Sequence, residues 1–114
     1  MTWKGVTIKD YELHGFFECG PEDDDFGGFT FHVKRGPWLV AFGMSPQTRD
    51  VSLAVARDGA QVFEFVGLSV PDVRWHGEGQ RERIEIVLGA RHSVFLELRP
   101  TVCVTHHLNV EVRV

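Results

Sequence analysis

Histidine is the residue type in this sequence best suited to metal binding and to proton transfer near neutral pH. The chain contains six, which are His14, His32, His76, His92, His106 and His107. None of them forms an H-x-H pair or an H-E-x-x-H helix, and none has the spacing to Asp or Glu that recurs in metal sites. The histidine pattern therefore does not predict a metal-dependent enzyme, and no cofactor is predicted.

His106 differs from the other histidines because it interrupts a stripe of apolar residues. Residues 102–114 alternate without a break, and His106 has the same parity as Val104 and Leu108. This position predicts an inward-facing imidazole, which is either hydrogen-bonded in the core or lines a cavity. His32 could approach it if their two strands are neighbours.

A run of four carboxylates, at positions 22–25, is the most unusual local feature. Asp23, Asp24 and Asp25 could together bind a hard cation such as calcium through oxygen. The run lacks the spaced D-x-D-x-D-G pattern, so the alternative is a solvated turn whose charge favours solubility. The net charge of −4 equals the charge of this run, since the remaining acidic and basic residues balance.

Other catalytic signatures are missing from the sequence. There is no G-x-S-x-G motif and no glycine-rich phosphate loop. Cys19 and Cys103 have no identifiable histidine partner, and we expect both thiols to be reduced. Three glutamates lie in strand-like segments with the parity of a solvent face, namely Glu64, Glu85 and Glu97. These observations favour a binding role over catalysis.

Two tryptophans lie beside glycine-containing turns at expected strand ends. Trp38 and Trp75 could stack on sugar rings if they are exposed at the rim of a sandwich. The alternative is that each seals one end of the core.

Period-two alternation of apolar and polar residues recurs along the chain and predicts strands. The expected fold is an all-β single domain spanning residues 1–114, an antiparallel β-sandwich or barrel of about eight to ten strands with at most one short helical turn. Ser45 and Pro46 could begin that turn, as N-cap and first helical residue. Residues 6–19 are expected to be extended, with a bend near Lys9 and Asp10.

The balanced surface argues against nucleic-acid binding, and no stretch is long enough to span a membrane. No signal peptide is evident, so the expected compartment is the cytoplasm. Residues 38–42 are apolar on both parities, and residues 102–114 are longer than a usual strand. Both features favour pairing across a two-fold axis, so a homodimer is expected.

We therefore predict a small soluble binding or interaction module that self-associates. One alternative is a β-barrel enzyme or small-molecule carrier, cupin-like in shape only, with His32 and His106 in a pocket and Trp75 at its entrance. A second alternative is a carbohydrate-binding module that uses Trp38 and Trp75.

Overall fold

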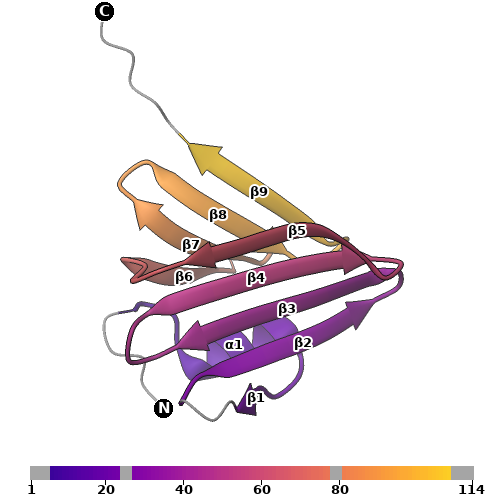
Figure 1. Ribbon diagram of the computed structural model, residues 1–114, viewed down its shortest axis with the longest axis horizontal. Helices are drawn as coiled ribbons and strands as arrows, with labels where there is room; N and C mark the ends of the chain where they lie inside the picture. The colour runs from indigo at the N-terminus through magenta and orange to yellow at the C-terminus, as the bar shows by residue number, and fades with distance from the viewer. Residues whose placement is uncertain (1–5, 24–26, 78–80, 109–114) are drawn as a thin grey trace, which may run out of the picture.

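A computed structural model describes residues 6–23, 27–77 and 81–108. These residues form one short helix and nine strands in two antiparallel sheets (Figure 1). The elements are α1 (Asp10–Phe17), β1 (Glu22–Asp23), β2 (Phe29–Arg35), β3 (Trp38–Ser45), β4 (Asp50–Arg57), β5 (Ala60–Gly67), β6 (Asp72–His76), β7 (Arg83–Gly89), β8 (His92–Glu97) and β9 (Cys103–Leu108). The predicted antiparallel all-β fold is confirmed.

The two sheets are both simple meanders. Sheet A has the order β1-β2-β3-β4-β5, and sheet B has the order β6-β7-β8-β9. Tight turns explain this connectivity: Asp58 and Gly59 both have positive φ, at 51° and 83°, between β4 and β5. An Asp-Gly pair with this geometry matches the twist of the two flanking strands and favours a two-residue hairpin.

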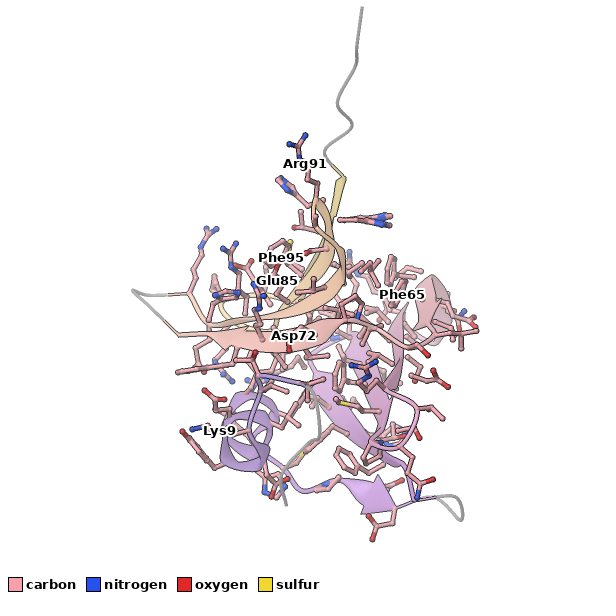
Figure 2. The ribbon with its side chains drawn as sticks, turned by 90° about the vertical axis from the view of Figure 1, so that its left-hand side faces the viewer. Lys9, Phe65, Asp72, Glu85, Arg91 and Phe95 are labelled. Atoms are coloured by element: carbon pink, nitrogen blue, oxygen red, sulfur yellow. The ribbon has the colours of Figure 1, made fainter. Side chains whose placement is uncertain are left out.

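One hydrophobic core lies between the sheets and α1. Figure 2 shows the helix in the angle between the two sheets, below sheet B and beside sheet A. Phe17 lies near its centre: its ring stacks on Phe31 at 4.8 Å and contacts Phe42 at 5.3 Å between centroids. Leu13 and Phe16 are also fully buried. The helix thus completes the core that the two sheets leave open.

The helix corrects the prediction for residues 6–19. Leu13, Phe16 and Phe17 follow the i, i+3, i+4 spacing of a helical face, and this signal outweighs the short alternation of Tyr11 and Leu13. The Glu12 carboxylate accepts a hydrogen bond from the backbone N–H of Lys9, at 2.9 Å, which satisfies one donor at the helix start.

The helical turn predicted at Ser45 and Pro46 is present as a single turn that does not continue into a helix. Ser45 is the last residue of β3, and residues 46–49 form the turn into β4. The backbone N–H of Arg49 donates to the Ser45 carbonyl at 2.8 Å, and Arg49 itself has a φ of 60°. The left-handed residue reverses the chain after a single turn, so no helix can propagate.

No helix among the described residues is long and apolar enough to cross a membrane.

Candidate functional site

The two histidines predicted to share a pocket lie on different sheets. His32 is on the outer face of sheet A, where its Nδ1 lies 3.4 Å from Oε2 of Glu22. Both side chains are largely exposed. His106 is on β9 in sheet B. The structure therefore does not bring His32 and His106 together.

His106 pairs with the buried Val94 and so shares the inner face of sheet B, but it is exposed, so the predicted core or cavity position is wrong. Val102 is buried and Val104 is half-buried, which means that β9 leaves the core as it proceeds. The imidazole of His106 stacks on that of His92, with centroids 4.7 Å apart and the Nε2 atoms 2.5 Å apart. The last part of the predicted thirteen-residue strand, residues 109–114, lies outside the described residues.

The two tryptophans are half-buried and also belong to different sheets. Trp38 opens β3, and the Arg57 guanidinium lies 5.2 Å from its ring centroid. Trp75 is on β6, and its Nε1 donates a hydrogen bond to Glu82 at 3.1 Å. Both rings pack against the core. They do not form a shared stacking platform for a sugar ring.

Only part of the predicted cation site falls within the described residues. Asp23 lies with Glu22 in the exposed two-residue strand β1, whereas Asp24 and Asp25 are outside the described residues. Among the residues that the structure does describe, no group of three His, Cys, Asp or Glu side chains could hold a metal ion. A cation at this loop stays a prediction.

The most developed polar network surrounds Glu85, on the outer face of sheet B. Its two carboxylate oxygens bind Ser93 Oγ at 2.7 Å and His76 Nε2 at 2.8 Å. Partial burial would raise the pKa of Glu85, but these two hydrogen bonds and the charges of His76 and Arg74 together lower it. Figure 2 shows Glu85 and Phe95 on the side of sheet B that faces away from α1.

Asp72 ties the N-terminal segment to the same sheet. Thr7 donates its backbone N–H and its hydroxyl to the two carboxylate oxygens, at 2.6 and 2.7 Å. Arg74 adds an ion pair at 2.9 Å. Partial burial opposes ionisation, yet the hydrogen bonds from Thr7, Arg74 and Val73 lower the pKa of Asp72. Neither network could be predicted from the sequence, because Thr7 and Asp72 are 65 positions apart and the partners of Glu85 lie on other strands.

The outer face of sheet A has a different composition. Ala41, Ala54 and Ala56 lie on neighbouring positions of β3 and β4, with Leu39 beside them. Together with His32, Gln61 and the backbone of β3 and β4, they line a shallow, mostly apolar hollow of about 160 Å³. Alanine is depleted in strands, so its repetition on a solvent face is not explained by strand stability.

Large apolar side chains are exposed at the hollow, where Leu39 lines it, and elsewhere on the same side of sheet A. Leu39 is 48% exposed, Val62 58% and Val66 60%. Val66 pairs with Ser52, one row along the strands from the alanines, and Val62 lies at the bulge where β5 pairs with Ala56. We call the surface formed by the outward side chains of β2 to β5 the alanine face.

Comparison with known proteins identifies the fold. No family model matches the sequence, and no curated protein matches it either. Among solved structures, the chain is similar to one from a complex described as a contact-dependent growth inhibition toxin–immunity protein complex from Klebsiella pneumoniae 342. The TM-score is 0.76 at 15% identity, covering 92% of this chain and 97% of that chain.

This comparison overturns the predicted function and partners. The similar chain belongs to a complex of a toxin with an immunity protein, which is a complex of two different proteins and not a homodimer or a complex with a small molecule or a sugar. The self-associating module, the histidine-lined carrier and the carbohydrate-binding module were therefore wrong. The geometry agrees, because neither the two histidines nor the two tryptophans converge.

Proposed function

We propose that this protein is the immunity component of a toxin–immunity pair, which binds a toxin protein and blocks its action. The observation that carries the proposal is the shared fold over nearly the whole length of both compared chains. A neutralising protein needs only a surface that fits its partner, and it needs no catalytic groups of its own.

The surface favours the immunity role over the toxin role. The charged groups of sheet B are bound to one another, as in the pairs Glu85–His76 and Asp72–Arg74. The alanine face instead leaves apolar side chains exposed, which is typical of surfaces that bind other proteins. Cys19 and Cys103 are both free thiols, which suits a reducing compartment, and we propose the cytoplasm.

The test is a growth assay with the polypeptide encoded by the gene that adjoins this chain's own. We expect that polypeptide to arrest a laboratory bacterium when it is expressed alone, and co-expression of this chain to restore growth. The two purified proteins should form a 1:1 complex with a dissociation constant of about 1 nM or tighter, near −12 kcal/mol. Growth arrest by this chain alone would show that it is the toxin and would overturn the proposal.

A further inference from the structure

We propose that the alanine face is the surface on which the toxin docks, and that its hollow receives one apolar toxin side chain flanked by lysine or arginine. This inference rests on the proposed function, because it names the surface through which the immunity protein would act.

The pairing of the strands explains why the hollow exists. Ala41 pairs with Ala54, and Leu39 pairs with Ala56, so small side chains fill the middle of the face. His32 on β2 and Glu64 on β5 continue the Ala41–Ala54 row on either side. Larger outer positions with a floor of alanines make a trough. Three of the five alanines in the sequence lie in that floor.

The exposed apolar groups indicate what the alanine face binds. Leu39, Val62 and Val66 are each about half exposed or more, although all three lie in strands with buried neighbours. Water is a poor solvent for such a grouped apolar surface, and covering it with an apolar partner is favourable. An aliphatic or aromatic side chain entering the hollow would bury Leu39 and the three alanine methyl groups together.

The face is large enough to carry much of an interface. Eight residues at ~3.3 Å and four strands at ~4.8 Å give roughly 26 by 19 Å, or about 500 Å². A stable complex typically buries about 800 Å² on each partner. Loops at either end of the strands would supply the remainder.

Charged residues at the border of the alanine face predict the sign of the partner's charge. Glu22 and Asp23 lie along the β2 side on β1, and Glu64 lies on β5, all exposed. Lys34 is the outward basic residue of β2, and the exposed Arg57 at the end of β4 lies 4.0 Å from the carboxylate of Asp58. The acidic excess would attract a basic partner and speed its association. It would also repel a second copy of this chain, whose border carries the same excess.

The experiment measures binding of the adjoining gene's product by isothermal titration calorimetry. Ala54→Arg places a long cation in the hollow, and we expect the dissociation constant to rise by at least about 30-fold. Thr105→Arg is the matched control, because Thr105 is an exposed strand residue on the outer face of sheet B. It should change affinity by less than about 2-fold, within the range of surface substitutions.

Two further variants test the same surface if Ala54→Arg does not fold. Leu39→Ser only shortens an exposed side chain, and it should weaken binding at the hollow. Glu64→Lys should lower the association rate about 3- to 10-fold, and less so at high salt.

The outcomes separate the two proposals. If the wild-type protein does not bind, the proposed function fails. If the wild type binds, but Thr105→Arg abolishes binding while Ala54→Arg, Leu39→Ser and Glu64→Lys do not, the function stands and the docking surface is overturned. Tighter binding by Glu64→Lys would overturn only the proposal that lysine or arginine flanks the apolar side chain of the toxin.

Discussion

The outer faces of the two sheets differ in the side chains that they present to solvent. On sheet B, charged and polar side chains bind each other, as Glu85 does with His76 and Ser93. On sheet A, the central positions are alanines, and leucine and valine lie exposed around them. Both faces belong to the same fold and cover the same core.

This difference indicates which face serves stability and which serves a partner. Hydrogen-bonded carboxylates on sheet B hold strands and the N-terminal segment in register. The alanine face adds little to folding, since small side chains make few cross-strand contacts. A partner protein can explain why small residues that contribute little to the fold occupy positions where the fold would accept larger side chains.

The largest expected effect tests whether the two sheets share one core. Phe17→Ala removes a fully buried ring that contacts Phe16, Phe31 and Phe42, and it should cost about 3–5 kcal/mol of unfolding free energy. Urea unfolding followed by fluorescence and by circular dichroism should give one coincident transition. Tyr11→Ala, on the exposed side of the same helix, is the control and should change little. Separate transitions for the two probes would refute a shared core.

The second prediction compares one glutamate from each face. Glu85→Ala leaves Ser93 and His76 without their acceptor and should cost about 1–3 kcal/mol of stability. Glu64→Ala removes only an exposed contact with Gln61 and should change stability by less than about 0.5 kcal/mol. Thermal unfolding of both variants measures the contrast. Equal losses of stability in the two variants would contradict the proposed difference between the outer faces of the two sheets.

The third prediction uses pH to test the carboxylates of sheet B. The pKa values of Asp72 and Glu85 are lowered in the folded state. The two carboxylates therefore stabilise the fold at pH values above their ordinary pKa, and this stabilisation is lost as the pH falls through their folded-state pKa values. Between pH 7 and 5 these two groups should change the melting temperature little. Below about pH 4 the melting temperature of the wild-type protein should fall more steeply than that of the Asp72→Asn/Glu85→Gln double variant. Parallel curves would contradict the role assigned to the two networks.

The smallest effect concerns the two cysteines. Burial raises the pKa of the Cys19 thiol, whose Sγ donates to the His32 carbonyl at 3.6 Å, whereas Cys103 is exposed. Iodoacetamide at pH 8 should therefore modify Cys103 before Cys19, because the thiolate is the reactive form. Mass spectrometry of timed digests would show the order, and faster labelling of Cys19 would contradict the packing described for β2 and α1.

Much of the fold follows from local sequence signals. Period-two alternation identifies the strands, and Asp58-Gly59 identifies a hairpin. The helix was missed because the i, i+3, i+4 spacing of Leu13, Phe16 and Phe17 covers only five residues and overlaps the alternation of Tyr11 and Leu13. Alternation also placed His106 inward, because parity alone does not reveal that β9 runs past the core.

The candidate surface was harder to predict than the fold. Ala41 and Ala54 come from different strands, and only their pairing makes a hollow. Glu85 was correctly placed on a solvent-facing strand position, yet its partners depend on the registers of β6 and β8. A sequence shows which residues face outward, but strand registers decide which of them meet.

The most direct test of the contrast between the sheets is an NMR titration that follows alanine methyl groups. Ala41, Ala54 and Ala56 report on the hollow, and Ala90 lies in the turn between β7 and β8 of sheet B. Adding the unlabelled product of the adjoining gene should shift the first three methyl signals and leave that of Ala90 unchanged. A shift of Ala90 alone, with the three hollow methyl groups unaffected, would place the toxin on sheet B and contradict the account.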